Sequence, residues 1–304
     1  MEVSTLVAAL GALIAAATLA AVLWQQRRYR RARRQVVQDR QPLLYPKRTF
    51  HVVTFLRIPP GADGVESVRR LRQEIEGPSG ARLVWAGQAA FTALASKQLP
   101  EVDWQAVVLV SYPSRSSYDA QATSAAYRGA LARFERHYSH GFVRPRALNW
   151  GVPVLLLGVL FMDRLRRRSR RTPFQPASPE QLDPRSRTDR ERLARLRALE
   201  PLGRDALVVV NLLRQGTPEQ RAADAAYGRQ MLGLFAENGH GPMHLGRAVP
   251  VEGDARFDHV AIVYYPGIDY FLSMVRSRFF NAIVGDKQPG DTLAVPTVPI
   301  TDLL

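Results

Sequence analysis

Two segments with nearly the same pattern of apolar residues dominate the chain. Each begins with an aromatic residue, continues through aliphatic and β-branched residues, and ends at Tyr-Pro: Trp104–Pro113 and Phe257–Pro266. A continuous apolar run between turn signals is typical of a strand that is buried on both faces. Proline ends such a strand because it has no amide hydrogen to donate to a neighbouring strand. We therefore predict two equivalent central strands.

The pattern around the first central strand predicts one α+β unit. Its elements, in chain order, are expected at 50–58 (strand), 65–76 (helix), 81–91 (strand), 104–113 (strand), 114–137 (long helix) and 141–146 (edge strand). The order β-α-β-β-α-β is that of the split unit of a ferredoxin-like fold.

The second half of the chain repeats this order. Leu212-Leu-Arg214 matches Phe55-Leu-Arg57, and Ser277-Arg-Phe-Phe280 matches Ser124-Ala-Ala-Tyr127 at the same offset from the strand-ending proline. Thr217-Pro-Glu-Gln220 has the form of a helix start. A sheet with helices on one face leaves its other apolar face bare, and such a face must be covered. We expect the two halves to pack sheet to sheet as an intramolecular pseudo-dimer.

This pattern resembles the dimeric α+β barrel superfamily, in particular its small DUF1330 and EthD-like members. The resemblance covers about 50–149 and 205–300 and rests on Tyr112-Pro-Ser114, on Tyr118 with Ser124–Tyr127, and on Ser277–Phe280. It implies an α+β fold in which two ferredoxin-like (βαββαβ) repeats pack as an intramolecular barrel. Relatives include monooxygenases, haem-degrading enzymes, isomerases and sensors, so the resemblance does not choose a function.

An apolar run from Val3 to Trp24 precedes the first unit. About 22 helical residues at 1.5 Å each span a hydrocarbon core of roughly 30 Å. A signal peptide carries positive charge before its apolar region, whereas here the arginines follow it. We predict an uncleaved anchor in the inner (cytoplasmic) membrane, with the soluble halves on the cytoplasmic side. Alanines at positions 8, 12, 16 and 20 could let two anchors pack as a homo-oligomer.

A second apolar stretch, Ala147–Met162, is short for a span and contains Asn149, Gly151 and Pro153. Arginines flank it on both sides, which favours an in-plane or re-entrant helix. A true second span and a buried soluble helix are the alternatives. The predicted organisation is an anchor at 1–26, a basic linker at 27–49, the first repeat at 50–146, a membrane-associated helix at 147–163, a basic, proline-containing linker at 164–204 and the second repeat at 205–304.

Charge and composition limit the classes of binding partner and of catalysis that the chain can have. The 304 residues carry a net charge of +15 and no cysteine, which excludes disulfides and thiol catalysis. The arginines cluster beside apolar segments rather than among surface aromatics, so membrane lipids are favoured over nucleic acid. The predicted lipid-binding residues are Arg27, Arg28, Arg30, Arg31, Arg164, Arg166, Arg167 and Arg168.

Few residues are candidates for a catalytic, metal-binding or cofactor-binding role. His51, Asn211 and His259 lie on predicted strands, where a histidine facing an apolar cavity could act as a general base. A structural role is the more common reading for each. His240 and His244 are separated by Gly-Pro-Met, in which Gly-Pro keeps them off one helix, and we predict no metal site. Haem-binding relatives use a histidine on a helix of the barrel domain. Here the corresponding helices have none before His137, so we expect no cofactor.

Two functions from different classes fit the sequence. The favoured one is a membrane-anchored module that binds a small apolar ligand or docks a protein. The alternative is a cofactor-independent oxygenase or isomerase that acts on an apolar substrate at the membrane surface. A cavity with a buried histidine within reach of Asn211 or of a tyrosine would favour the enzyme, and a filled cavity would favour the module.

Overall fold

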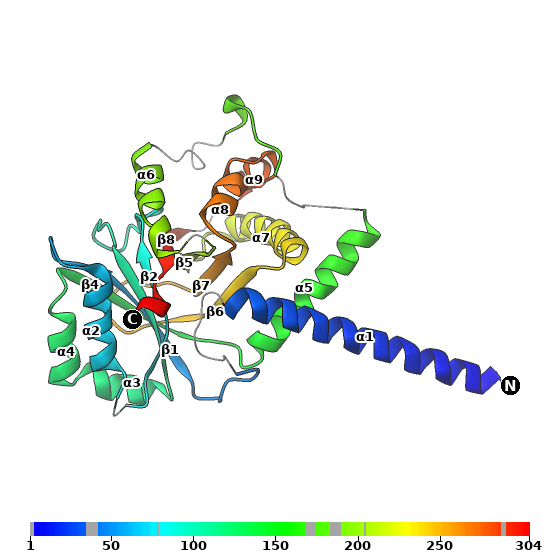
Figure 1. Ribbon diagram of the computed structural model, residues 1–304, viewed down its shortest axis with the longest axis horizontal. Helices are drawn as coiled ribbons and strands as arrows, with labels where there is room; N and C mark the ends of the chain where they lie inside the picture. The colour runs from blue at the N-terminus through cyan, green and yellow to red at the C-terminus, as the bar shows by residue number, and fades with distance from the viewer. Residues whose placement is uncertain are drawn as a thin grey trace.

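A computed structural model of the protein describes residues 3–34, 42–77, 79–167, 174–182, 190–203, 205–286 and 290–304. Parts of the predicted linkers at 27–49 and 164–204, including Arg168, lie outside these residues. Eight strands form a closed barrel, and helices pack on its outer surface (Figure 1). The chain therefore has a mixed α+β fold built around one barrel.

The first half of the barrel follows the predicted order of elements. These are β1 (Phe50–Arg57), α2 (Gly64–Ile75), β2 (Arg82–Ala89), β3 (Ala106–Tyr112), α3 (Arg115–Ala122), α4 (Ala125–Leu131) and β4 (Arg136–Val143). Helix α2 begins where the Asp63 carboxylate accepts a hydrogen bond from the Glu66 amide. It buries Val68, Leu71 and Ile75, which share one helical face.

The second half has the same order. Its elements are β5 (Leu207–Arg214), α7 (Pro218–Asn238), β6 (Gly241–Pro250), β7 (His259–Tyr265), α8 (Ile268–Val275), α9 (Arg278–Ile283) and β8 (Asp291–Pro299). Thr217 and Gln220 form the predicted capping box of α7. The helix ends at Gly239, whose positive φ of 74° favours glycine.

The predicted long helix at 114–137 was wrong in its extent. It is two helices, because the hydroxyl of Ser124 accepts from the Tyr127 amide and starts α4 afresh. Ser277 starts α9 in the same way through the Phe280 amide. After α4 the chain enters β4 at Arg136, so His137 lies on a strand and not at the end of a helix.

The two halves join at their edges. The strand order is β1-β3-β2-β8-β5-β7-β6-β4, and the named pairs are antiparallel. The first half supplies β4-β1-β3-β2 and the second β8-β5-β7-β6, so β2 pairs with β8 and β4 with β6. The predicted barrel is therefore confirmed, and the two halves form it through pairing of their edge strands. Closure pairs the strand edges that two open sheets would leave exposed.

Glycines allow the close approach at both seams. A side chain at Gly87 on β2 would meet Thr297 Cβ of β8 at 2.9 Å, and one at Gly141 on β4 would meet the Val249 carbonyl oxygen of β6 at 3.0 Å. Only a residue without Cβ fits at these positions.

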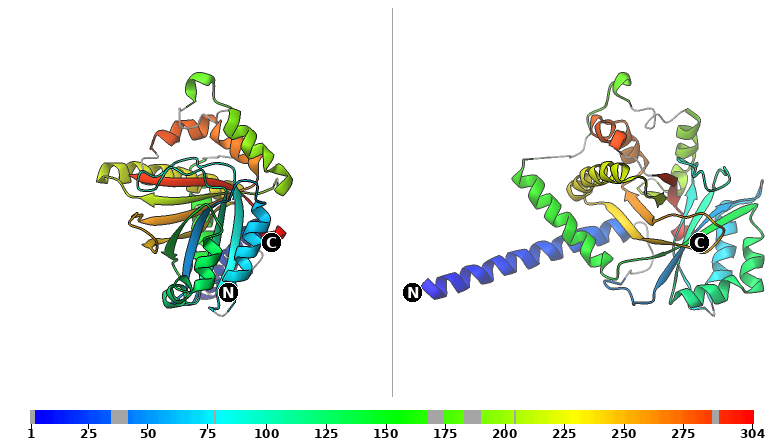
Figure 2. Two further views of the ribbon diagram at one scale, coloured as in Figure 1. Left: turned by 90° about the vertical axis from the view of Figure 1, so that its left-hand side faces the viewer. Right: turned by 180° about the vertical axis from the view of Figure 1, so that it is seen from behind.

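Three hydrophobic clusters stabilise the barrel. One fills its interior with side chains from both halves, including Phe55, Trp85 and Phe142. A second lies under α7, α8 and α9, and a third under α2, α3 and α4. Figure 2 shows these two helical layers on different sides of the barrel. The interior is largely a packed core, because inward-facing side chains of a small barrel fill its lumen.

Two further helices lie outside the repeated order. Helix α1 (Val3–Arg34) projects far from the barrel, and α5 (Leu148–Leu165) crosses it near the barrel (Figure 1). Val7–Ala32 and Leu148–Leu165 are long and apolar enough to cross a membrane, and 33% of the second is buried in the protein. A signal sequence and a core helix share these properties. The remaining elements are α6 (Arg190–Ala198) and the 3-10 turns η1 (Pro179–Gln181), η3 (Glu200–Leu202), η4 (Val284–Asp286) and η5 (Thr301–Leu303).

Candidate functional site

The three histidine and asparagine candidates from the sequence do not meet. His51 is fully buried inside the barrel, where its ring stacks on Phe142 with the centroids 5.2 Å apart. Burial, together with the nearby Arg144 cation, holds the pKa of His51 well below its usual value. His51 is therefore a neutral side chain of the barrel interior.

Asn211 faces the helical layer outside the barrel. Val210 and Leu212, its neighbours on β5, point into the interior core, and strand side chains alternate. The Asn211 amide group donates to the carbonyl oxygens of Val209 and Ala261 at 3.2 and 3.1 Å. His259 is exposed and lies 3.0 Å from the Gln215 side chain. These bonds describe structural roles for both residues.

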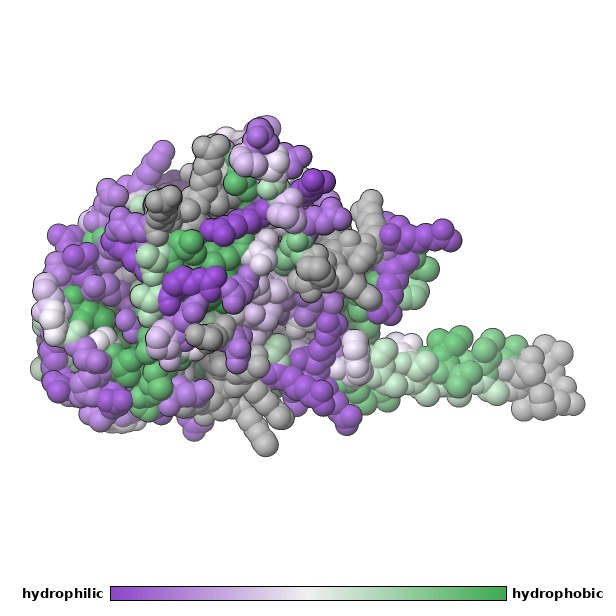
Figure 3. Space-filling view, turned by 45° about the horizontal axis from the view of Figure 1, so that its top comes forward, coloured by the Kyte–Doolittle hydropathy of each residue, from purple (hydrophilic) through white to green (hydrophobic). Residues whose placement is uncertain are grey.

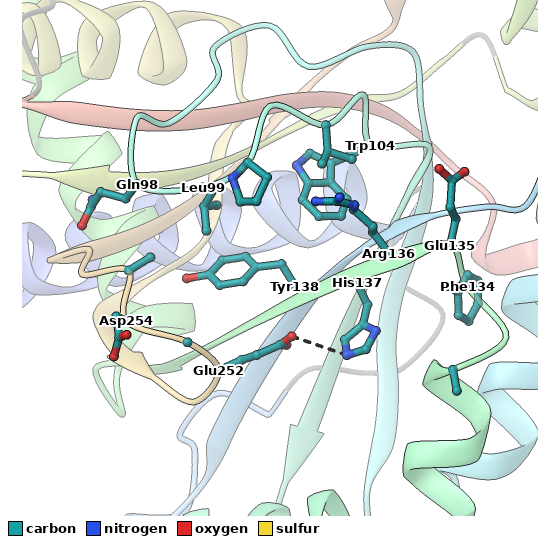
Figure 4. Close-up of a pocket in the computed structure, with 15 residues that line it drawn as sticks. Gln98, Leu99, Trp104, Phe134, Glu135, Arg136, His137, Tyr138, Glu252 and Asp254 are labelled. Carbon is teal, nitrogen blue, oxygen red and sulfur yellow. Dashed lines mark ion pairs between the residues drawn. The ribbon is translucent and has the colours of Figure 1, made fainter.

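A pocket of about 800 Å³ lies at the end of the barrel where β4 begins. Three segments line it: the loop 98–104 before β3, residues 132–138 from the turn after α4 into β4, and the 252–255 turn between β6 and β7 (Figure 4). The floor is apolar. Trp104 is 3% exposed, and its ring lies 5.9 Å from Phe55 of the interior core.

A buried hydrogen-bonded pair extends from this pocket into the barrel. Tyr138 is one of the residues that line the pocket, and its hydroxyl lies 2.9 Å from Nδ1 of His140. Both residues are on β4, two positions apart, and so face the same way. His140 is fully buried against the edge of Phe257, with a ring centroid distance of 5.4 Å.

Burial sets the protonation state of this pair. It lowers the pKa of His140 to about 4, helped by the Arg256 cation, and raises the pKa of Tyr138 well above its usual value. Near neutral pH the pair therefore consists of a neutral imidazole and a neutral phenol. Either the phenol donates to Nδ1, or an Nδ1–H donates to the phenol oxygen and leaves the hydroxyl hydrogen available to a ligand.

A carboxylate holds the pocket rim together. Glu252 Oε2 accepts from the Ser139 amide at 2.7 Å, and Oε1 lies 3.4 Å from His137 Nε2. Figure 4 shows this ion pair beside Tyr138. His137 and Ser139 are on β4, on either side of Tyr138 in the sequence. The two contacts therefore tie the 252–255 turn to this strand. Sequence reasoning missed this site, since it placed the strand start at 141. The alternation of Tyr138, His140 and Phe142 was the available signal.

Metal-ligand clusters do not occur among the described residues: no group of three or more His, Cys, Asp or Glu side chains could hold an ion there. His240 Nε2 lies 2.6 Å from the Tyr270 hydroxyl and Nδ1 lies 3.1 Å from the Tyr264 carbonyl oxygen. His244 Nδ1 lies 2.6 Å from an Arg144 nitrogen. The two histidines thus serve different polar contacts.

The predicted lipid-binding arginines have unequal surroundings. Arg28 is half-buried and donates to the Glu237 carbonyl oxygen at 2.9 Å, at the end of α7. The other described members are exposed: Arg27, Arg30, Arg31, Arg164, Arg166 and Arg167. Arg28 therefore belongs to the junction between α1 and the barrel.

No sequence-family model matches the chain. No curated protein matches it significantly in sequence. Among solved structures, it is similar to a variant of chlorite dismutase from Candidatus Nitrospira defluvii, with 11% identity, a TM-score of 0.45 and coverage of 87% of this chain and 98% of that one. An anthrone oxidase-like protein has 8% identity and a TM-score of 0.44, with 85% and 96% of the two chains covered.

A candidate monooxygenase from Lactobacillus acidophilus is similar at 8% identity and a TM-score of 0.41, over 84% of this chain and 95% of that one. All three likenesses are too distant to assign an activity. What the structure itself defines is a closed α+β barrel with a pocket at one end.

Proposed function

We propose that this protein is a membrane-tethered member of the dimeric α+β barrel superfamily that binds a small, largely apolar molecule in the pocket at the start of β4. In this proposal the two halves are copies of one ferredoxin-like unit, α1 is the tether, and Tyr138 is the polar contact for the ligand. The observation that supports this proposal most directly is that the pocket combines an apolar floor with the buried phenol of Tyr138, which is oriented by its hydrogen bond with His140. Ligand pockets typically combine apolar walls with few polar groups.

The pocket suits a molecule with an apolar body and a polar end. Besides Tyr138, its lining includes six polar or charged residues: Gln98, Glu135, Arg136, His137, Glu252 and Asp254. Trp104, Val102 and Leu99 supply the apolar wall, and the volume of about 800 Å³ lies within the usual range for small-molecule sites. The Tyr138 hydroxyl, oriented by His140, could bond one carbonyl or hydroxyl oxygen. The packed barrel core below keeps the ligand at the barrel mouth.

The second candidate function is that of an enzyme, a cofactor-independent oxygenase or isomerase. The observation that favours it is the same Tyr138–His140 pair, because a buried histidine within reach of a cavity tyrosine is what a cofactor-independent oxygenase or isomerase would need. With Nδ1–H bonded to the phenol oxygen, the hydroxyl could donate to a substrate carbonyl and stabilise an enolate oxygen as it forms. The low pKa of His140 disfavours it as the proton acceptor.

Native mass spectrometry of the full-length protein in detergent tests the binding proposal. We expect a reproducible small molecule to be retained by the wild type. Leu99→Trp, which adds bulk to the pocket wall, should lose it. Leu94→Trp is the matched control, since Leu94 is exposed on the same loop and does not line the pocket.

Any one of three results would overturn the proposal. A wild-type protein that is consistently empty would point to a scaffold that docks other proteins. A molecule retained equally by Leu99→Trp and the wild type would place the binding site elsewhere. Loss from both tryptophan variants would likewise contradict a site at this pocket, provided that both keep the wild-type circular dichroism spectrum.

A further inference from the structure

Exposed apolar side chains gather around the place where α1 leaves the barrel. They come from the projecting part of α1, from Leu43 and Leu44 in the loop before β1, and from α5. Figure 3 shows the apolar surface of α1 extending away from the polar body. Large apolar side chains in contiguous exposed patches mark an interaction surface.

Helix α5 has two apolar faces with different surroundings. Val152, Leu156 and Leu160 recur every four residues and are buried in the cluster under α7. Five large apolar side chains on the opposite side of α5 are exposed by 43–63%: Trp150, Leu155, Phe161, Met162 and Leu165. A helix that covers a soluble core normally has a polar outer face. The outer face of α5 is instead suited to the acyl and headgroup boundary of a bilayer.

Hydrogen bonds at the junction join α1 to three other elements. Gln26 Nε2 donates to the Trp150 carbonyl oxygen of α5 at 3.2 Å, and Arg28 donates to the last turn of α7. The Tyr29 hydroxyl is buried and donates to the Pro242 carbonyl oxygen of β6 at 2.5 Å. These contacts determine the orientation of the barrel relative to α1.

The direction of α5 follows from this junction. Figures 1 and 2 show α5 crossing α1 obliquely, on the side of the barrel from which α1 projects. If α1 spans a bilayer along its axis, α5 cannot run beside it as a second span, and its exposed face meets the bilayer surface instead. Leu43 and Leu44 are close by, because the Tyr45 amide donates to the Arg146 carbonyl oxygen just before α5.

Positive charge surrounds this surface. The exposed arginines are Arg27, Arg30 and Arg31 after the apolar part of α1, Arg146 before α5, and Arg164, Arg166 and Arg167 at its end. Cations at the edge of an apolar surface are complementary to anionic lipid headgroups. A protein partner would need a matching acidic rim and would compete with the bilayer that α1 already enters.

We infer that α5 and the Leu43–Leu44 loop lie in the interface of the bilayer that α1 spans, with anionic lipid as their partner. The inference rests on the proposed tether. It also orients the pocket. Strand β4 begins at the pocket, at Arg136–Tyr138, and ends at Val143. Its eight residues at about 3.3 Å each separate the pocket from Arg144, which donates to the Asn149 side chain of α5. The pocket therefore opens away from the bilayer and receives its ligand from the aqueous phase.

Spin labels test this arrangement in the full-length protein. The chain has no cysteine, so each introduced cysteine is labelled alone. The protein would be reconstituted in phosphatidylcholine vesicles that contain phosphatidylglycerol, and label depth measured from relaxation by oxygen and by a water-soluble nickel complex. Leu155→Cys and Phe161→Cys report on α5, Leu13→Cys on α1, and Ala120→Cys on the exposed surface of α3.

We expect labels at 155 and 161 to lie at one shallow depth, with 13 deep in the bilayer and 120 in water. Nickel accessibility at 155 and 161 equal to that at 120 would overturn the inference while leaving the tether intact. Depth that differs strongly between 155 and 161 would overturn it in favour of a second span. A water-exposed label at 13 would instead remove the tether on which the inference rests. The pocket is tested separately by ligand retention.

Discussion

The phenol of Tyr138 and the imidazole of His140 form a buried hydrogen-bonded pair, with Oη 2.9 Å from Nδ1. Phe257 covers the ring of His140, and the pocket lies on the Tyr138 side. The pair therefore connects the packed interior of the barrel with the pocket. Its properties lead to two predictions.

Tyr138→Phe should weaken ligand binding and stability together. Loss of the hydroxyl removes the polar contact to the ligand and leaves His140 Nδ1 without its partner, and an unsatisfied buried group costs about 1–3 kcal/mol. We expect roughly 5- to 10-fold weaker retention of the molecule found by native mass spectrometry, and a lower free energy of unfolding in urea. Unchanged retention in Tyr138→Phe would show that the hydroxyl does not contact the ligand.

Stability should fall as the pH is lowered through the range set by His140. The pKa of His140 is about 4 when folded, against 6.5 as its ordinary value, so the unfolded chain binds the proton first. The free energy of unfolding therefore rises with pH between about 4 and 6.5, by up to about 1.4 kcal/mol per unit for one such group. His240, with a pKa of about 3, extends this dependence to lower pH.

His140→Gln provides the comparison, because glutamine keeps a polar side chain but does not titrate. Urea unfolding at several pH values gives the slope of the unfolding free energy against pH. Between about pH 4 and 6.5 we expect this slope to be smaller for the variant than for the wild type, by the equivalent of about one bound proton. Equal slopes would mean that His140 is protonated alike in the folded and unfolded chains.

Gly141→Ala should destabilise the seam between β4 and β6. A Cβ there would approach the ring of Phe50 and lie 3.0 Å from the Val249 carbonyl oxygen, so β4 or β6 would have to move. We expect a loss of at least about 1–3 kcal/mol, as for other overpacked sites. Gly129→Ala in α4 is the control, since a Cβ meets nothing within 4 Å there. It should stabilise by about 0.5–1 kcal/mol. A tolerated Gly141→Ala in thermal unfolding would argue against the paired seam.

Leu156→Ala should show that α5 is part of the folded barrel. Leu156 is fully buried under α7, whereas the adjacent Leu155 is 51% exposed. Truncation of a buried leucine costs about 2–5 kcal/mol. We expect a large loss in the urea unfolding free energy of the detergent-solubilised protein for Leu156→Ala and a small one for Leu155→Ala. Similar small losses for both would indicate that α5 is not packed against α7.

The elements of the barrel could be predicted because their signals are local. The central strands showed continuous apolar runs, and Thr217 with Gln220 marked the start of α7. The breaks at Ser124 and Ser277 were missed, although the two residues had been aligned with each other. A hydroxyl residue within an otherwise helical pattern does not show by itself whether it caps a new helix or continues the old one.

The candidate site could not be predicted to the same degree. His51 was correctly placed on a strand, but its neighbours Phe142 and His244 come from strands β4 and β6, distant in the chain. Tyr138 and His140 were overlooked since the strand was expected to start later. Which buried histidine meets a cavity depends on the 252–255 turn and the loop before β3, and both reach the site only after the barrel closes.

The sequence by itself determined the types and order of the elements, because apolar periodicity, caps and prolines act over a few residues. It also determined the two apolar helices and the basic segments beside them. Only the tertiary structure decided that the halves join at β2–β8 and β4–β6, that Gln26, Arg28 and Tyr29 hold α1 to the barrel, and that the pocket lies at the opposite end of β4. Those features depend on strand register and on contacts between residues far apart in the chain, which local patterns do not encode.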